Sequence, residues 1–198
     1  MIGLCNQWAN DTMENFDHDF RLVSSSGRTI LFLSKTKETI MSINASQLRQ
    51  AIVRPVLKNL DLWSQAAENL IMGTAAQESG LGTYVEQVGG GPARGIFQME
   101  PATLNDCYVN FLDYRAPLKA KIDAYLAAQP EKADQLATNN AYAAAMCRVR
   151  YMRVSDPLPD ANDINGLAAY WKQNYNTPGG AGTVEEFVAN YNRYLGGN

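Results

Sequence analysis

Apolar residues recur every three or four positions through most of the chain after residue 45, which is the spacing of amphipathic α-helices. Ser46, Ser64 and Thr183 are predicted N-caps, and the spacing from Thr183 to Glu186 predicts a capping box. Pro55 is expected to kink or split the first helix. The predicted helical segments are 46–60, 64–78, 101–111, 117–126, 140–153, 164–175 and 183–195.

The first part of the chain has a different pattern. Two β-favouring runs, Thr29–Leu33 and Thr39–Ile43, flank a polar turn and predict a hairpin. His18 lies in an Asp-His-Asp triplet without further ligands nearby, so we expect a solvated side chain there rather than a metal site. We therefore expect residues 1–44 to form a short β-rich N-terminal arm and residues 45–198 to form one mainly α domain.

Glu78 stands out near the end of the predicted 64–78 helix. It falls on the apolar face marked by Ala67, Ile71 and Ala75, so its carboxyl group is expected to point toward the core. Desolvation and the negative end of the helix dipole, close to Gly80, would both raise its pKa. A carboxylic acid that stays protonated near neutral pH can act as a general acid. The alternative is a solvated glutamate at a helix end.

A glycine-rich segment follows Glu78. The run Gly89-Gly90-Gly91-Pro92 cannot continue a helix, so it predicts either one wall of a cleft, built as a loop or short hairpin, or simply a flexible turn. Glu86 and Glu100 lie on either side of this run, and either carboxylate could activate a water molecule. A capping role explains Glu100, because it precedes a proline at the start of a helix. Glu86 is therefore the candidate second carboxylate.

Three short motifs in this region resemble a known family. Glu78-Ser79, then Gly95-Ile96-Phe97-Gln98, then Pro101-x-Thr103 are similar to the ES…GLMQ…P-x-T pattern of soluble lytic transglycosylases and goose-type lysozymes. The resemblance implies a mainly α, lysozyme-like (α+β) fold, with a helical bundle around a saccharide cleft and a small hairpin or loop wall. It also implies that Glu78 is the general acid and that Gln98 lines the cleft.

The C-terminal third extends the resemblance with departures. Leu167-Ala168-Ala169-Tyr170 is similar to the family's A-A-Y-N segment, but Trp171 stands where the family has Asn. Tyr175-Asn176 resembles the start of a second family motif, Y-N-A-G-P-G. The resemblance implies that Tyr170 or Tyr175 holds Glu78 in place, and we favour Tyr170. In the 140–153 helix, Cys147 and Arg148 replace the usual Tyr and Leu. The implied substrate-binding residues are Ser79, Gln98, Tyr170, Tyr175 and Asn176.

The activity implied by the resemblance is cleavage of the β-1,4 bond between N-acetylmuramic acid and N-acetylglucosamine in peptidoglycan. With Glu78 as the one convincing carboxylate, a lytic transglycosylase is favoured, because that reaction needs no second protein base. Inverting hydrolysis with Glu86 as the base is the first alternative. A virion structural protein with a degenerate lysozyme-like fold is the second. No metal and no organic cofactor is implied. Trp63 is a candidate sugar platform, although a core position is favoured for it.

Composition limits the remaining possibilities. The net charge of −3 and the lack of a basic cluster give no case for nucleic-acid binding. No apolar stretch is long enough to span a membrane. The three cysteines and the absence of a signal-peptide pattern after Met1 are typical of a protein made in the cytoplasm. These features favour a phage virion-associated lysin or an endolysin that acts at the bacterial cell wall or periplasm. Residues 1–44 are then either an attachment segment for other virion proteins or simply a cap on the domain.

Overall fold

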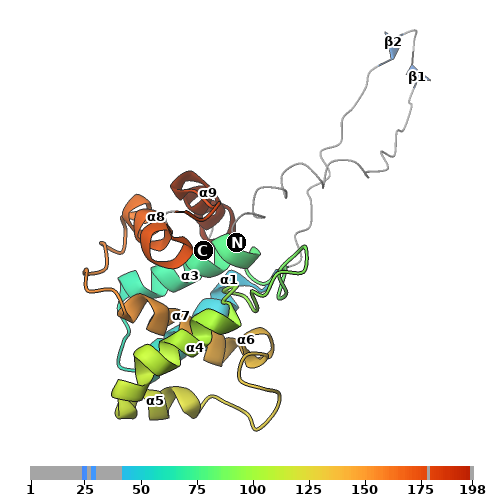
Figure 1. Cartoon of the computed structure of the whole chain (residues 1–198). Helices are drawn as coiled ribbons and strands as arrows, with labels where there is room; N and C mark the ends of the chain where they lie inside the picture. Colours follow the sequence, from blue (N-terminus) through green and yellow to red (C-terminus); the bar gives the residue numbers. More distant parts are fainter. Residues whose placement is uncertain (1–23, 26–27, 30–41, 178, 197–198) are drawn as a thin grey trace.

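Helices make up most of the structure, a computed structural model that describes residues 24–25, 28–29, 42–177 and 179–196 (Figure 1). The mainly α prediction is therefore confirmed. The strands β1 (Ser24–Ser25) and β2 (Arg28–Thr29) form a short antiparallel pair. Most of the hairpin predicted from Thr29 to Ile43 lies outside the described residues, as does His18.

The helical segments follow most of the predicted ones. Two short helices, η3 and α6, lie outside the predicted segments, and the last part of the predicted 164–175 helix is π-helical. The elements are α1 (Ala45–Gln47), η2 (Leu48–Val53), α2 (Arg54–Asn59), α3 (Gln65–Ser79), α4 (Pro101–Asn110), η3 (Leu112–Tyr114), α5 (Ala116–Asp123), α6 (Gln135–Thr138), α7 (Asn140–Met152), α8 (Ile164–Trp171), η4 (Lys172–Asn176) and α9 (Val184–Leu195).

The first helical run is continuous through Pro55 rather than split. The π-helical segment η2 ends just before the proline, which occupies the first turn of α2. Proline lacks an N–H and is tolerated in a first turn, and a local change of helix type absorbs the mismatch. The N-cap of this run is Asn44, whose side chain accepts a hydrogen bond from Gln47 N at 3.0 Å. The prediction of Ser46 as the cap is therefore wrong by two residues.

Helix α3 is the central element of the fold. It lies between α8 and α9 on one side and α7 on the other (Figure 1). Ser64 caps its N-terminus as predicted, and Gly80 ends it in the left-handed conformation, with φ of 56°. Every residue from Ala67 to Ala76 is buried. Since α3 is buried on all faces, Glu78 lies next to the core because it is in the last turn of this helix, and not because one face is apolar.

The segment between α3 and α4 returns on itself in short β-bridges. Arg94 pairs with Glu86 and with Met99, both in antiparallel fashion. These bridges fold residues 84–100 into a compact loop beside the end of α3. Helix α9 begins with the predicted capping box of Thr183 and Glu186. Among the described residues, no helix has the length and apolar character that crossing a membrane would require.

Candidate active site

Glu78 is half-buried in the last turn of α3. Its Oε1 accepts a hydrogen bond of 2.8 Å from the indole Nε1 of Trp171, at the end of α8. Burial raises the pKa of Glu78 to about 7, although the hydrogen bond from Trp171 opposes part of this rise. The predicted increase in pKa is therefore present, with burial as its leading cause. At neutral pH, Glu78 is close to half protonated and can both give and take a proton.

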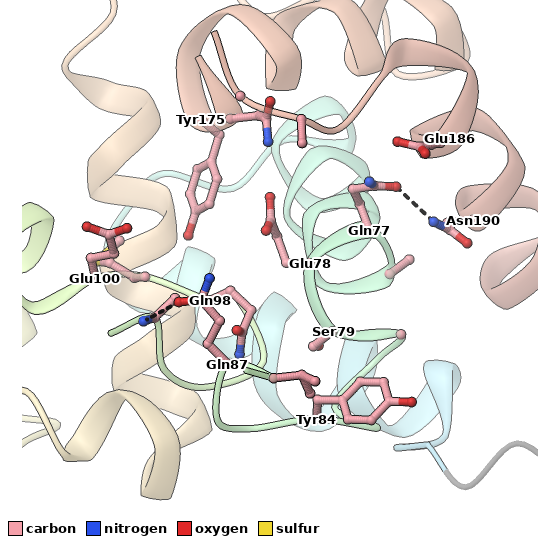
Figure 2. Close-up of a pocket in the computed structure, with 18 of the residues that line it drawn as sticks. Gln77, Glu78, Ser79, Tyr84, Gln87, Gln98, Glu100, Tyr175, Glu186 and Asn190 are labelled. Atoms are coloured by element: carbon pink, nitrogen blue, oxygen red, sulfur yellow. Dashed lines mark hydrogen bonds between the residues drawn. The ribbon is translucent and has the colours of Figure 1, made fainter. Parts of the chain in front are cut away.

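A cavity of about 560 Å³ contains Glu78. Figure 2 shows the carboxyl group of Glu78 near the centre, with Tyr175 and Gln98 on one side and Gln77 and Asn190 on the other. Side-chain amides are abundant in the lining, and each amide offers both donors and acceptors of hydrogen bonds. The amides that line the cavity are Gln77, Gln87, Gln98, Asn176 and Asn190.

Five residues between Tyr84 and Ala93 line the cavity, so the chain on both sides of the glycine run forms a wall beside Glu78, whereas residues 89–92 themselves are outside the lining. The side chains of Tyr84 and Val88 are 42% and 44% exposed at this wall. The loop is tied to α6 by an ion pair between Arg94 and Asp134. It is therefore attached to the domain at a point outside the cavity.

Ser79 has a structural role that the substrate-binding prediction did not anticipate. The residue is only 2% exposed, and its hydroxyl group donates to Ile96 O at 2.7 Å. The same oxygen accepts a hydrogen bond from Gly82 N at 2.8 Å. With both its donor and an acceptor position used inside the protein, the Ser79 hydroxyl joins α3 to the next loop rather than presenting a free group to a ligand. Ser79 also lines the cavity, so its contact with a substrate stays a prediction.

Gln98 lines the cavity as predicted. Its backbone has a positive φ of 45°, in a tight turn that follows Gly95 at φ of 75°. The side-chain Nε2 donates to Gly95 O at 2.8 Å, which fixes the amide against its own turn. A positive φ is uncommon in residues other than glycine. At Gln98 the turn maintains this conformation, since both the backbone N–H and the side-chain amide of Gln98 donate to Gly95 O.

The two candidate tyrosines have separate roles. Tyr175 lines the cavity beside Glu78, and its hydroxyl donates to Phe97 O at 2.8 Å. Tyr170 is outside this lining, and its hydroxyl donates to Asp156 O at 3.1 Å. The prediction that Tyr170 holds Glu78 is therefore wrong. Trp171, the next residue, provides that hydrogen bond, because its side chain leaves the helix in a different direction.

Asn176 lines the cavity as predicted. Its Oδ1 accepts a hydrogen bond of 2.8 Å from Lys172 Nζ, which also donates to Gly180 O at 2.6 Å. Lys172 thus ties the end of η4 to the segment that precedes α9. This contact fixes the wall to which Asn176 and Tyr175 belong.

Three further carboxylates line the cavity: Glu86, Glu100 and Glu186. Glu86 and Glu100 are exposed. Glu100 is the N-cap residue of α4, but its side chain makes no capping hydrogen bond, so the structure does not support the capping role predicted for that side chain. Glu186 is used in the capping box, where it accepts from Thr183 N at 2.9 Å. Arg150 is the one cationic side chain in the lining formed by the described residues.

Sequence reasoning did not anticipate that α9 would line the site. Gln77, next to Glu78, accepts a hydrogen bond of 2.8 Å from Asn190 Nδ2. Tyr194 belongs to the same helix and also lines the cavity. The aromatic residue nearest to Gly80 is Tyr194, whose hydroxyl would be 2.7 Å from a Cβ at that glycine. The helical period indicated the core face of α9, but nothing in it indicated contact with the end of α3.

Trp63 is outside the cavity and is 43% exposed, so the preferred core position is wrong. Its indole N–H donates to Glu68 Oε2 at 2.8 Å. Glu68 is fully buried and also binds Arg49 at 2.9 Å and Arg54 at 2.8 Å. This buried ion-pair network joins α3 to the first helical run. No pattern in the sequence predicted it.

The two residues of α7 that depart from the family pattern have different surroundings. Cys147 is buried, and its burial raises the pKa of the thiol well above the usual value. Arg148 has its Nε buried without a hydrogen-bond partner among the described residues. Among the described residues, no group of three or more His, Cys, Asp or Glu side chains is arranged to hold a metal ion.

Comparisons of this chain with protein-family models, with curated proteins and with solved structures gave no match.

Proposed function

We propose that this protein is a peptidoglycan lytic transglycosylase that cleaves the β-1,4 bond between N-acetylmuramic acid and N-acetylglucosamine. The observation that carries the proposal is the half-buried Glu78, whose pKa of about 7 places a proton donor at the centre of an amide-lined cavity. The proposal includes a lysozyme-like arrangement, in which α3 presents the acid and residues 84–100 form the loop wall.

Glu78 would protonate the glycosidic oxygen as the C1–O bond breaks, which releases one saccharide with a free hydroxyl group. The resemblance implies that the acetamido group of the substrate stabilises the cationic centre. The ionised Glu78 would then remove the proton from the C6 hydroxyl, whose oxygen bonds to C1 and gives a 1,6-anhydro product. A carboxyl group with a pKa near 7 suits both steps, because neither protonation state is strongly disfavoured at neutral pH.

The lining supports a saccharide as substrate. Sugars present hydroxyl and acetamido groups that need matched donors and acceptors, and the five side-chain amides provide both. Tyr84 and Tyr194 add aromatic surface at the edge of the same cavity. A lining this rich in polar side chains suits a hydroxyl-rich ligand better than an apolar one.

Inverting hydrolysis is the second candidate, and the positions of Glu86 and Glu100 favour it. Both carboxylates line the cavity that holds Glu78, so either could serve as the base that activates water. This reaction would consume water and leave a reducing end. The product therefore separates the two reactions.

Mass spectrometry of purified peptidoglycan after digestion tests the proposal. We expect products that end in 1,6-anhydromuramic acid, and we expect Glu78→Gln to lose them while it remains folded. Glu131→Gln is the matched control, because Glu131 is an exposed glutamate outside this cavity. Reducing-end products would establish hydrolysis instead. No digestion by the folded wild-type protein, or full activity of Glu78→Gln, would overturn the enzymatic proposal.

A further inference from the structure

We propose that Trp171 is a positioning residue that reserves Oε1 of Glu78 as a hydrogen-bond acceptor, so that Oε2 carries and delivers the proton. This inference rests on the proposed function of Glu78 as an acid. The resemblance provided no role for Trp171, which departs from the family pattern at this position.

The donor chemistry of indole defines the arrangement. An indole N–H can donate a hydrogen bond but cannot accept one. Trp171 Nε1 is 2.8 Å from Glu78 Oε1, so Oε1 accepts whether the carboxyl group is ionised or protonated. In the protonated form, this contact favours the acidic hydrogen on Oε2, because the carbonyl oxygen of a carboxylic acid is a better acceptor than its hydroxyl oxygen. One oxygen is thus assigned to the protein and the other to the substrate.

Packing holds the indole ring in position. Trp171 is 1% exposed, so solvent does not compete for its N–H. Its ring centroid is 5.3 Å from that of Phe187 on α9, with the two rings tilted by 34°. Phe187 in turn fills the space above Gly73 of α3, where a Cβ would be 2.4 Å from its Cζ. Through Phe187, the indole ring is therefore packed against α3, the helix that carries Glu78.

The other ionisable groups near Glu78 supply no fixed opposite charge at its carboxyl group. Cys147 and Tyr151 of α7 are buried, and Tyr175 of η4 is partly buried. Desolvation raises the pKa of each well above its usual value, so all three are neutral at pH 7. The charged residues of the cavity lining other than Glu78 belong to the walls of the wider cavity; they are Arg150, Glu86, Glu100 and Glu186. Among the contacts of its carboxyl group, the hydrogen bond from Trp171 is thus the one that lowers the pKa of Glu78.

The first test is a titration of Glu78 by NMR in protein with carbon-13 in the glutamate carboxyl groups, with Glu78→Gln used for assignment. Trp171→Phe removes the N–H and keeps an aromatic ring. Because the N–H stabilises the ionised carboxylate, we expect the measured pKa of Glu78 to rise by about 1 in this variant. Trp63→Phe is the matched control, because it removes an indole N–H that donates to a different carboxylate, Glu68, and leaves the contact with Glu78 in place. An unchanged pKa of Glu78 in Trp171→Phe, or an equal change in Trp63→Phe, would overturn the inference.

A second measurement needs no substitution at Trp171. The indole 15N–1H signal of Trp171 in otherwise wild-type protein should shift with pH and report the same pKa as the Glu78 carboxyl carbon, and the shift should disappear in Glu78→Gln. An indole signal that ignores the titration of Glu78 would contradict the hydrogen bond.

Kinetics separate this inference from the proposed function. We expect the alkaline limb of the kcat profile to move upward by about 1 pH unit in Trp171→Phe. At a pH where Glu78 is protonated in both proteins, kcat should fall about tenfold with little change in KM, because orientation of the acid is lost. If the titrations change as expected and the wild-type protein cleaves no glycan, the hydrogen-bond role of Trp171 stands and the enzymatic proposal fails. If cleavage occurs and the profile of Trp171→Phe is unchanged, the inference fails alone.

Discussion

The hydroxyl group of Ser79 donates a hydrogen bond to the carbonyl oxygen of Ile96 at 2.7 Å. The bond joins the last residue of α3 to the turn that carries Gln98, across 17 positions in the sequence. The two motifs that suggested the candidate site, Glu78-Ser79 and Gly95–Gln98, are therefore connected directly. Their relative position depends on a buried side chain that does not itself offer a free group to a ligand.

Ser79→Ala should destabilise the protein and weaken its activity. The substitution leaves a buried carbonyl group without this donor, so we expect the free energy of unfolding to fall by about 1–3 kcal/mol, measured by urea denaturation. Ser64→Ala provides a control of similar cost, because it removes the N-cap of the same helix at its far end. We expect the glycan-cleavage rate of folded protein to fall in Ser79→Ala and to stay unchanged in Ser64→Ala. Equal rates in both variants would contradict a positioning role for Ser79.

The raised pKa of Glu78 makes stability depend on pH. The unfolded chain binds this proton near the ordinary value of 4.5, and the folded protein binds it near 7. Between these values the folded state holds more protons, so its stability falls as pH rises and the loss is complete above the folded pKa. Glu78→Gln should remove this loss. We therefore expect the melting temperature of the variant, minus that of wild type, to be larger at about pH 8 than at about pH 4. A constant difference between the two proteins across this range would contradict a raised pKa.

Much of the fold could be predicted from local sequence. The Ser64 cap, the αL glycine at Gly80 and the capping box at Thr183 are rules of adjacent residues, and each was found in the structure. Glu78 was also recognisable, because a carboxylate at the end of an apolar helix is unusual. Local rules did not succeed everywhere, because Asn44 rather than Ser46 caps the first helical run and the Glu100 side chain makes no capping hydrogen bond.

The partner of Glu78 could not be predicted in the same way. Trp171 is 93 positions away in the sequence, and which of Tyr170 and Trp171 faces Glu78 depends on the rotation of α8 against α3. That rotation is determined by packing in three dimensions, including the contact of Trp171 with Phe187. An error of one residue therefore gave a tyrosine hydroxyl as the predicted donor, where the structure has an indole N–H.

Glu68 should contribute strongly to stability. Burial alone would raise the pKa of its carboxyl group, but hydrogen bonds from Arg54, Trp63 and Arg49 outweigh burial and lower the pKa to about 2. Glu68→Gln breaks a fully buried ion-pair network, for which we expect a loss of about 3–5 kcal/mol in the free energy of unfolding at neutral pH. Urea denaturation measures this loss, and Glu131→Gln serves as the exposed control.

The same network predicts a second, acidic pH dependence. The unfolded chain protonates Glu68 near its ordinary pKa of 4.5, whereas the folded protein does so only near 2. The contribution of Glu68 is therefore complete above the unfolded value and is lost as pH falls through the folded one. The stability difference between wild type and Glu68→Gln should narrow over this range in denaturation curves. A difference that stays constant down to about pH 2 would show that the carboxylate is not held ionised.

Gly95 and Gly90 provide a matched pair for testing how the loop is attached. Both have positive φ, 75° and 80°, so alanine is strained at either position and should cost about 1–2 kcal/mol for that reason alone. At Gly90, a Cβ would have no neighbour within 4 Å, whereas at Gly95 it would be 1.8 Å from Leu136 O. A backbone carbonyl cannot move aside as a flexible side chain can. Gly95→Ala must therefore displace the turn that precedes Gln98 from α6.

We expect the stability loss of Gly95→Ala to exceed that of Gly90→Ala by at least about 2 kcal/mol in urea denaturation, because a backbone clash adds to the same conformational strain. Glycan cleavage should fall sharply in Gly95→Ala, since Gln98 and the Ile96 carbonyl that binds Ser79 belong to the displaced turn. In Gly90→Ala, cleavage should stay near the wild-type rate. Similar losses in both variants would mean that the turn has room to shift, and that the contact between the loop and α6 does not position Gln98.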